Sequence, residues 1–306
     1  MPGTTPNFSG SPRVVNTLVV MGVGLIGGSY ALALKQAGLV KHVIGVGRSM
    51  ANLEDALAHG IVDEVTTDPQ YAIQKADLLM LATPVGQLDT ILPLVERYLP
   101  AHAMVTDAGS TKGNVVALAR QHLKTRLSAF VPGHPIAGAE FSGAKAAKPD
   151  LYRKKHVVIT PLAETDPEAV LAVKALWEVC GADVREMTPD LHDRIFAAVS
   201  HLPHVLSFAL VEALASRENG SVFFDFAASG FRDFTRIASS HPEMWRDICL
   251  ANKQALLAEL NEYRHQLDRL ADLLASSDGE ALEQVFLTAR EARNAWLQKR
   301  QASLQV

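Results

Sequence analysis

The 306-residue chain has only two cysteines, Cys180 and Cys249, too few for a disulfide framework or a four-thiolate zinc site. It has no excess of positive charge, since 29 Lys and Arg face 33 Asp and Glu, which argues against a nucleic-acid partner. No continuous apolar run approaches the roughly 18 to 20 residues that span a bilayer, and residues 1–13 lack the apolar core of a signal peptide. These absences predict a cytoplasmic protein, without a membrane or nucleic-acid partner.

The composition is that of a globular protein. Hydrophobic residues make up 48% of the chain, and its 20 Gly and 15 Pro are scattered rather than clustered, which excludes a disordered or low-complexity chain. The length exceeds what one hydrophobic core usually serves, so two domains are expected.

The first half alternates short apolar runs with helical patterns. The runs of strand length are residues 14–21, 43–46, 77–83, 104–107, 130–132 and 156–160. Helical patterns of about 10 to 14 residues between such strands are typical of βαβ units, which form a parallel sheet covered on both faces. The fold class predicted for this half is therefore an α/β, doubly wound sheet.

The pattern changes near Thr188, after which helical periodicity dominates. Leucines and one tyrosine recur at spacings of 4, 3, 4, 3 and 4 between Leu256 and Leu274, a seam suited to packing within a bundle or across a dimer. A last helix is expected over residues 279–300. The predicted organisation is a tail (1–13), a doubly wound α/β domain (14–187) and an all-helical domain (188–306).

A glycine-rich loop follows the first strand directly and opens a helix. It reads Gly22-Val-Gly24-Leu25-Ile26-Gly27. In a dinucleotide-binding fold the first glycine allows a tight turn, the second lets the backbone approach a pyrophosphate, and the third permits close packing of helix on strand. The phosphates then bind to free amides at the positive end of the helix.

The end of the second strand bears on the choice of cofactor. An NAD site usually has Asp or Glu here, but the sequence has Gly47-Arg48-Ser49, which offers a cation and a hydroxyl to a 2′-phosphate. NADP is therefore the preferred cofactor, with NAD also possible. Thr83 and Pro84, where the third strand ends, are expected to line the same site.

Three further segments carry residues suited to chemistry. Residues 106–113 include Ser110 at the carboxyl end of a strand, where it could also cap the next helix. Residues 133–140 place His134 between Gly and Pro on a strand-end loop. Residues 200–204 hold His201 and His204 in a helical run that Pro203 should kink. No carboxylate or thiol pattern supports a metal site.

Together these segments resemble the TyrA-type prephenate/arogenate (cyclohexadienyl) dehydrogenase family of tyrosine biosynthesis. The segments in family order are the glycine loop, residues 107–113, 133–140, 200–204 and 231–238, the last followed by 244–247. The resemblance implies a Rossmann-type N-terminal domain, a helical C-terminal domain that forms a homodimer, and oxidative decarboxylation of a small-molecule substrate with hydride transfer to NAD(P)⁺.

The chemistry of that reaction assigns roles to residues. His134, as a neutral imidazole, would accept the proton of the substrate hydroxyl. The resemblance implies that Ser110 orients His134, and Arg236 is suited to clamp the ring carboxylate. Side-chain contacts are expected from Arg232 and Trp245, which the partner subunit can supply in this family. The family positions that line the site are His201, His204 and Glu140.

Substrate preference stays open, between prephenate, arogenate or both. Arogenate carries an ammonium that a carboxylate would favour; Ala139 cannot supply one, whereas Glu140 could. Two other readings are a dehydrogenase of the β-hydroxyacid or pyrroline-carboxylate reductase type, and a non-catalytic NADP-sensing protein on the same fold.

Overall fold

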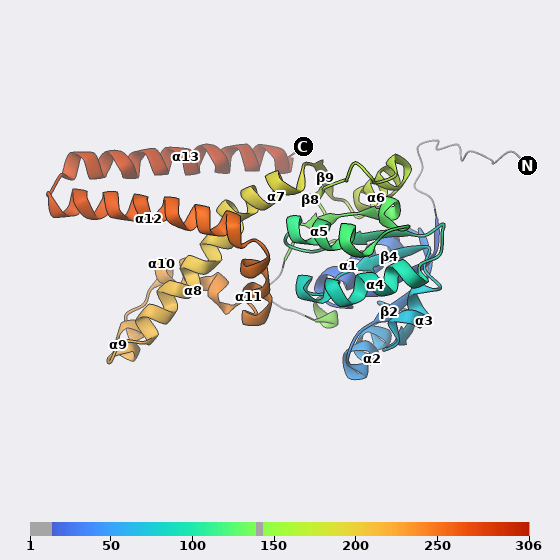
Figure 1. Cartoon of the computed structure of the whole chain (residues 1–306). Coiled ribbons are helices and arrows are strands. Elements are labelled where there is room, and N and C mark those ends of the chain that lie inside the picture. Colours follow the sequence, from blue (N-terminus) through green and yellow to red (C-terminus); the bar gives the residue numbers. More distant parts are fainter. Residues whose placement is uncertain (1–13, 139–142, 306) are drawn as a thin grey trace, which may run out of the picture. The chain divides into compact units, whose positions relative to one another are not determined.

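The computed structural model describes residues 14–138 and 143–305 (Figure 1). The chain divides into two compact units, of which the first ends at Asn252 and the second is Lys253–Val306. The second unit is a helical hairpin of α12 (Lys253–Ala275) and α13 (Gly279–Gln305). The first unit holds all the strands of the described residues.

A six-stranded parallel sheet forms the centre of the first unit. Its strands are β1 (Val15–Met21), β2 (Val40–Val46), β3 (Glu64–Thr66), β4 (Leu78–Leu81), β5 (Met104–Asp107) and β6 (Phe130–Val131). They lie in the order β3-β2-β1-β4-β5-β6, and every pairing is parallel. The order reverses between β1 and β4, and ligands of such sheets bind outside the carboxyl ends of the strands at this point.

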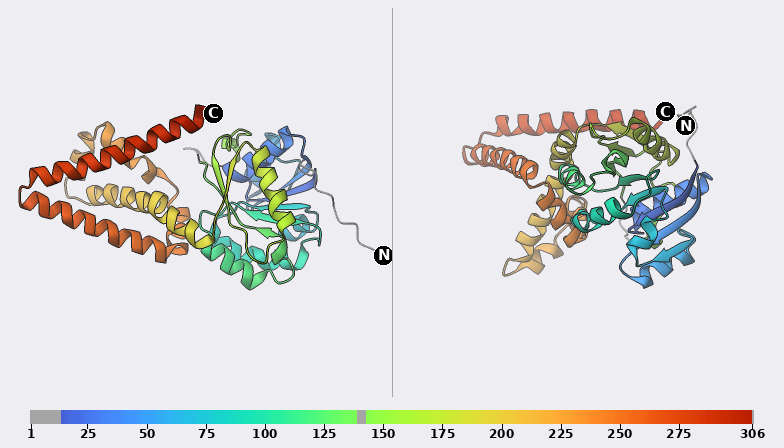
Figure 2. Two further views of the ribbon diagram at one scale, coloured as in Figure 1. Left: turned by 90° about the horizontal axis from the view of Figure 1, so that it is seen from above. Right: turned by 45° about the vertical axis from the view of Figure 1, so that its right-hand side comes forward.

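Alternate residues of the strands face two separate cores. In β1, Leu18 and Val20 belong to one core, while Val19 and Met21 belong to the other. The first core includes residues of α1 and α6, and the second includes residues of α3, α4 and α5, so helices cover both faces (Figure 2). The helices of this part are α1 (Leu25–Gln36), α2 (Met50–Ala58), α3 (Pro69–Ile73), α4 (Leu88–Tyr98), α5 (Gly113–His122) and α6 (Pro167–Val179). The predicted doubly wound fold is confirmed.

A second, three-stranded sheet was not predicted. It consists of β7 (Gly133–Pro135), β8 (His156–Ile159) and β9 (Asp183–Glu186), with β7 antiparallel to β8. The expectation that residues 156–160 extend the parallel sheet is therefore wrong. Pro132 has no amide hydrogen to continue β6, and its carbonyl instead accepts a hydrogen bond from the Thr160 amide at 2.9 Å.

Beyond β9 the described chain is helical. Between β9 and the end of the first unit the helices are α7 (Pro189–Phe196), α8 (Leu202–Ala215), α9 (Gly220–Asp225), α10 (Ser229–Thr235) and α11 (Pro242–Ala251). A π-helical turn, Ala197–His201, joins α7 to α8 just before Pro203. Proline lacks the amide that a regular helix needs, and the wider turn accommodates this loss.

One helix, Pro189–Ala215, is long and apolar enough by length and composition to cross a membrane, although the sequence contains no continuous apolar run of that length. Its first part packs on the sheet domain, because Asp193 accepts hydrogen bonds from the backbone amides of Lys112 and Gly113. The charged Asp193 and the buried His192 and His201 on this helix would be unfavourable in lipid.

Candidate active site

The three glycines of the loop after β1 differ in how closely other atoms approach them. Gly22 has a φ of +92°, and a Cβ there would lie 2.6 Å from the carbonyl oxygen of Ala82. At Gly27 a Cβ would lie 2.6 Å from a side-chain carbon of Val20. Gly24 differs, because no heavy atom lies within 4 Å of its Cβ position. The first and third glycines thus allow the close packing, and the second leaves its backbone accessible.

A cavity of about 930 Å³ lies at the start of α1. Gly24, the N-cap of α1, has no side chain to bond the first-turn amides of Leu25, Ile26 and Gly27, which also lack intrahelical acceptors. The predicted cofactor residues that line the cavity are Gly22, Gly24, Gly47, Arg48, Ser49, Thr83 and Pro84. The other predicted cofactor residues are not among the lining residues but lie in the first turn of α1, directly after Gly24: Leu25, Ile26 and Gly27. Open backbone amides and a cavity of this size fit a dinucleotide.

The end of β2 supplies a cation and a hydroxyl to this cavity. Arg48 is exposed and forms no ion pair with the described residues. Ser49 is the N-cap of α2, but its hydroxyl makes no capping hydrogen bond. The lining also includes one carboxylate, Asp55, whose Oδ2 lies 3.3 Å from Nζ of Lys145.

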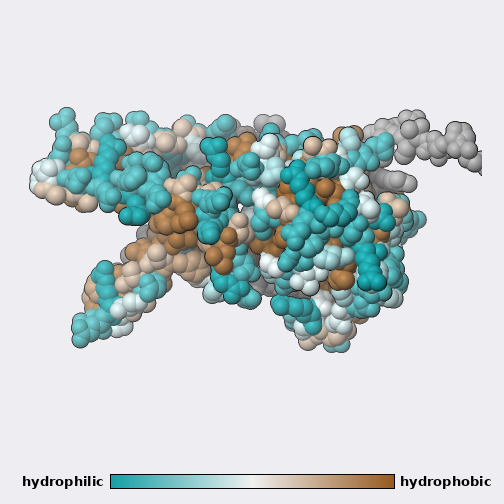
Figure 3. Space-filling view, viewed as in Figure 1, coloured by the Kyte–Doolittle hydropathy of each residue, from teal (hydrophilic) through white to brown (hydrophobic). Residues whose placement is uncertain are grey.

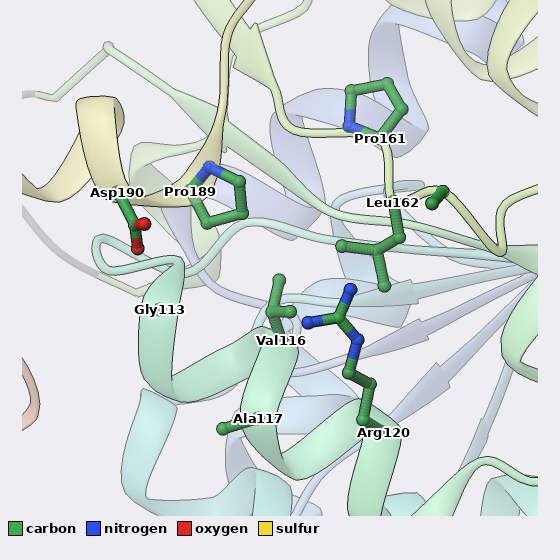
Figure 4. Close-up of a pocket in the computed structure, with 9 residues that line it drawn as sticks. Gly113, Val116, Ala117, Arg120, Pro161, Leu162, Pro189 and Asp190 are labelled. Carbon is green, nitrogen blue, oxygen red and sulfur yellow. The ribbon is translucent and has the colours of Figure 1, made fainter.

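A smaller pocket of about 330 Å³ lies between α5, the segment after β8 and the start of α7 (Figure 4). Its lining residues are Gly113, Val116, Ala117, Arg120, Pro161, Leu162, Ala163, Pro189 and Asp190. The guanidinium of Arg120 is engaged by Glu164, at 2.9 and 3.1 Å. This pocket contains no histidine, and it is not the site described below.

His134 lies in the middle of β7, with its ring against two residues of α7. Its Nδ1 is 2.8 Å from Nε2 of His192, and the ring of Phe196 packs on both imidazoles, with centroids 4.9 and 4.5 Å away. Burial, aided by His192 and the positive charge of Lys112, lowers the pKa of His134 well below its usual value. His134 is therefore neutral at physiological pH.

Asp193 joins this pair of histidines to the start of α5. Its Oδ1 lies 2.7 Å from Nδ1 of His192, and its two oxygens accept the amide hydrogens of Lys112 and Gly113, each at 2.8 Å. Burial alone would raise the pKa of Asp193, but these hydrogen bonds outweigh it and hold the pKa below the usual value. Asp193 is therefore an ionised acceptor at a helix N-terminus.

A buried ion pair fixes the strand that carries His134. The carboxylate of Asp107, at the end of β5, binds the ammonium of Lys112, and both side chains are buried. Lys112 Nζ also donates to the carbonyl of Gly133 at 2.6 Å, and the Gly133 amide donates to Asp107 at 3.0 Å. Burial lowers the pKa of Lys112, and the charge of Asp107 opposes this effect. The two side chains thus hold β7 against the carboxyl end of β5.

His201 is buried at the end of the π-helical turn that follows α7. The side-chain amide of Asn252 donates to the carbonyl of Asp193 at 2.8 Å and lies 3.1 Å from Nδ1 of His201. Burial lowers the pKa of His201 to about 4, although Asp193 and the backbone of Ser110 act in the opposite direction.

His204 is stacked on Trp245, with ring centroids 3.6 Å apart and planes at 19°. Its Nδ1 lies 2.8 Å from the carbonyl of Ser200, so Nδ1 carries the hydrogen and Nε2 is left as an acceptor. Burial, together with the nearby charge of Arg236, lowers the pKa of His204. The indole Nε1 of Trp245 is buried and has no hydrogen-bond partner in the described residues.

The structure brings several predicted site residues together and separates others. Arg236 is exposed and forms no ion pair with the described residues, whereas Arg232 pairs with its neighbour Asp233 at 3.3 Å. Glu140 lies outside the described residues. Ser110 was expected to orient His134, but the described contacts include none between these two residues: His192 occupies Nδ1 of His134, and the backbone of Ser110 hydrogen-bonds to His201.

Sequence reasoning missed His192, Asp193 and Lys112 as members of this cluster. The one local signal was the adjacent pair His192-Asp193 at the start of a helix, and nothing in the sequence pairs it with a residue 58 positions earlier. Lys112 was visible within a motif, but its burial depends on the fold.

An open glycine cradle and a cluster of neutral histidines both lie at the carboxyl edge of a doubly wound sheet that is followed by helices. This combination defines a dehydrogenase that binds a nicotinamide dinucleotide.

Comparison with known proteins narrows this class. The family model "Prephenate dehydrogenase, nucleotide-binding domain" matches residues 30–186, and "Prephenate dehydrogenase, dimerization domain" matches residues 188–288. A prephenate dehydrogenase of Bacillus subtilis is 38% identical over 92% of this chain and 76% of its own length. A cyclohexadienyl dehydrogenase of Zymomonas mobilis is 33% identical, covering 92% of this chain and 96% of its own.

Solved structures agree with this. The crystal structure of prephenate dehydrogenase from Aquifex aeolicus, in complex with hydroxyphenyl propionate and NAD⁺, superposes with a TM-score of 0.86 at 36% identity and covers 92% of this chain and 98% of that one. The chain belongs to the prephenate dehydrogenase family and is an oxidoreductase. The predicted family, enzyme class and binding of a nicotinamide dinucleotide are confirmed.

Proposed function

We propose that this enzyme converts prephenate, arogenate or both to 4-hydroxyphenylpyruvate or tyrosine, with NADP⁺ preferred over NAD⁺. The observation that carries the proposal is the state of His134: its Nδ1 is occupied by His192, its pKa is lowered by burial, and its Nε2 has no partner in the described residues. A neutral histidine with one free acceptor nitrogen, at the carboxyl edge of a dinucleotide-binding sheet, is suited to remove a hydroxyl proton.

The reaction balances through that nitrogen. The C4–H bond of the substrate breaks and its electron pair leaves as hydride, while the hydroxyl proton moves to Nε2 of His134. A nicotinamide dinucleotide held in the cavity at the start of α1 would supply the hydride acceptor. The bond from C1 to the ring carboxylate then breaks, CO₂ leaves, and the ring becomes aromatic. His134 returns its proton to the phenolic oxygen, which a histidine of lowered pKa does readily.

Arg236 is the cation proposed to hold the ring carboxylate. Its guanidinium is exposed, forms no ion pair with the described residues, and lies close enough to His204 to lower the pKa of that ring. His201, His204 and Trp245 are proposed to form the wall beside it. Arg232 and Glu140 keep their predicted roles as part of this proposal.

Steady-state kinetics with purified prephenate and arogenate test the function. Production of reduced nicotinamide should depend on one of the two substrates and should fall by about 10²- to 10⁴-fold in kcat in His134→Asn, the range for a lost general base. Turnover of neither substrate, or a near-normal kcat in His134→Asn, would contradict the proposal. His204, whose Nε2 has no partner in the part of the chain that the structure describes, is then the next candidate.

The preference for NADP⁺ rests on Arg48 and Ser49 at the cavity wall. A charged hydrogen bond to phosphate contributes about 1.5–3 kcal/mol, so Arg48→Gln should raise KM for NADP⁺ by roughly 10- to 100-fold and leave KM for NAD⁺ nearly unchanged. Lys41→Gln is the matched control, because Lys41 is an exposed cation on β2 that does not line the cavity.

Gly47→Asp tests the same preference in the opposite direction. A Cβ at Gly47 would lie 3.2 Å from the end of the Leu53 side chain, which can move, so the variant should fold. The new carboxylate should repel the 2′-phosphate and favour NAD⁺. A wild-type enzyme that is equally efficient with NAD⁺ would refute the preference.

A homodimer through the helical domain is part of the proposal. The helices beyond β9 expose large apolar side chains, seen as brown residues over α8 in Figure 3. Exposed examples are Leu210, Val222, Phe223, Phe224, Phe226 and Phe234 in the first unit, and Leu257, Leu267, Leu274, Phe286 and Trp296 in the second. Exposed apolar surface of this extent is typical of protein interfaces.

Sedimentation analysis at micromolar concentration should give twice the chain mass, and Phe226→Asp, at a side chain that is 84% exposed, should shift it toward the monomer. A monomeric wild type would contradict this. The proposal keeps the predicted domain limits of 1–13, 14–187 and 188–306, and a cytoplasmic location.

A further inference from the structure

Three hydrogen-bonded groups run in series from the proposed base to the main chain of α5. His134 contacts His192 at 2.8 Å, His192 contacts Asp193 at 2.7 Å, and Asp193 accepts the amides of Lys112 and Gly113. His192 is fully buried and Asp193 nearly so. The proposed reaction does not use either of them directly.

Proton positions in this series follow from its fixed end. Asp193 receives two backbone N–H groups at the positive end of α5, so its carboxylate is ionised and can only accept. Nδ1 of His192, 2.7 Å from Oδ1 of Asp193, must therefore carry the hydrogen. A neutral His192 then presents a lone pair at Nε2.

That lone pair decides the tautomer of His134. The two facing nitrogens, Nδ1 of His134 and Nε2 of His192, are 2.8 Å apart, and one of them must donate. Since Nε2 of His192 is the acceptor, Nδ1 of His134 carries the hydrogen. Nε2 of His134 can then accept a proton. The ring of Phe196 packs on both imidazoles and restricts their rotation.

The contact between His134 and His192 changes when His134 accepts a proton, although burial still holds the pKa of His134 well below its usual value. When Nε2 takes up the substrate proton, the ring becomes an imidazolium that still donates from Nδ1 to His192. The negative charge of Asp193 strengthens the acceptor, so the contact is stronger after proton transfer than before it.

We propose that His192, held by Asp193, is a positioning residue that fixes His134 in its Nδ1–H tautomer and keeps Nε2 as the proton acceptor. The expected effect on kinetics rests on the proposed function. The tautomer of His134 does not depend on that function and can be tested separately.

The direct test is the tautomer of His134 by nitrogen-15 NMR of histidine-labelled protein, in which long-range correlations distinguish Nδ1–H from Nε2–H. The wild type should show Nδ1–H. His192→Phe, which keeps a buried ring but removes the acceptor, should release His134 into a mixture containing Nε2–H. His192→Gln, whose amide oxygen can accept from Nδ1, should restore the wild-type form. A wild type in the Nε2–H form would overturn the inference whether or not the enzyme turns over prephenate.

Kinetics provide the second test. His192→Phe should lower kcat by about 10²-fold, the lower end of a general base contribution, with KM for both substrates changed less than threefold. His192→Gln should recover most of that loss. His265→Phe, at an exposed histidine of α12, is the control and should leave kcat unchanged. If His192→Phe keeps both its kcat and a pure Nδ1–H signal for His134, His192 is not the positioning residue. A wild type that turns over neither substrate would refute the proposed function and leave the NMR result to decide the inference.

Discussion

Acid should destabilise this fold through His201. The side chain of His201 is only 1% exposed, and burial lowers its pKa to about 4. In the unfolded chain the ring titrates at about 6.5. The unfolded state therefore binds more protons between these values, so the free energy of unfolding falls as the pH drops through this window and is fully retained only above it.

The size of the effect follows from the two pKa values. At about 1.4 kcal/mol for each pKa unit, the difference amounts to about 3 kcal/mol once the pH is below 4, and about 2 kcal/mol is already lost between pH 7 and pH 5. His201→Gln removes the titrating group and can still hydrogen-bond to Asn252. The variant should therefore lose about 2 kcal/mol less than the wild type over that interval.

Urea unfolding followed by circular dichroism at pH 7 and pH 5, at one fixed protein concentration, measures both losses. His265→Gln, at an exposed histidine, should behave as the wild type does. The other buried histidines lower the free energy of unfolding in acid in the wild type and in both variants. The difference in loss between the wild type and His201→Gln therefore measures the contribution of His201. Equal losses in the wild type and His201→Gln would show that the buried neutral ring does not carry the effect.

Other substitutions have distinct expected outcomes. Arg236→Gln should raise KM for the dicarboxylate substrate by roughly 10- to 100-fold with a smaller change in kcat, because the carboxylate is already charged in the ground state; Lys41→Gln is the control in the same assay. Lys112→Met should lower the free energy of unfolding by about 3–5 kcal/mol in urea titrations, since it leaves Asp107 buried and unpaired. Gly22→Ala should abolish dinucleotide binding measured by fluorescence titration and lower stability by at least about 1–3 kcal/mol, because its φ is +92° and the added Cβ would meet a carbonyl oxygen at 2.6 Å.

The central sheet could be predicted because its strands are read from local composition. The apolar runs at residues 14–21 and 77–83 correspond to β1 and β4; all of β4 and the last four residues of β1 are buried and apolar. β3 escaped notice because it is only three residues long, Glu64–Thr66, with no buried position among them. Its place is set by pairing with β2, and a single sequence contains no local signal for that contact.

The second sheet and the histidine series could not be predicted for a related reason. β7 consists of Gly133, His134 and Pro135, none of which favours a strand. It is extended because Lys112 and Asp107 bind both polar groups of Gly133 and because β8 pairs with it. The motif containing His134 was recognisable, but the partner at its Nδ1 depends on how α7 packs, and the family resemblance implied Ser110 instead.

Burial links the proposed chemistry of this enzyme to its stability. A histidine can accept a substrate proton only if it is neutral, and enclosing His134 among His192, Phe196 and the Lys112 ammonium secures that state. The enclosure also lowers the pKa of His192, His201 and His204, and each of these rings favours the unfolded state in acid. A substitution that opened the cluster to water would therefore raise the histidine pKa values and reduce the acid sensitivity of the fold. It would also leave His134 protonated at a higher pH and less able to act as the base. Acid resistance and activity near neutral pH should therefore change in opposite directions among variants of this cluster.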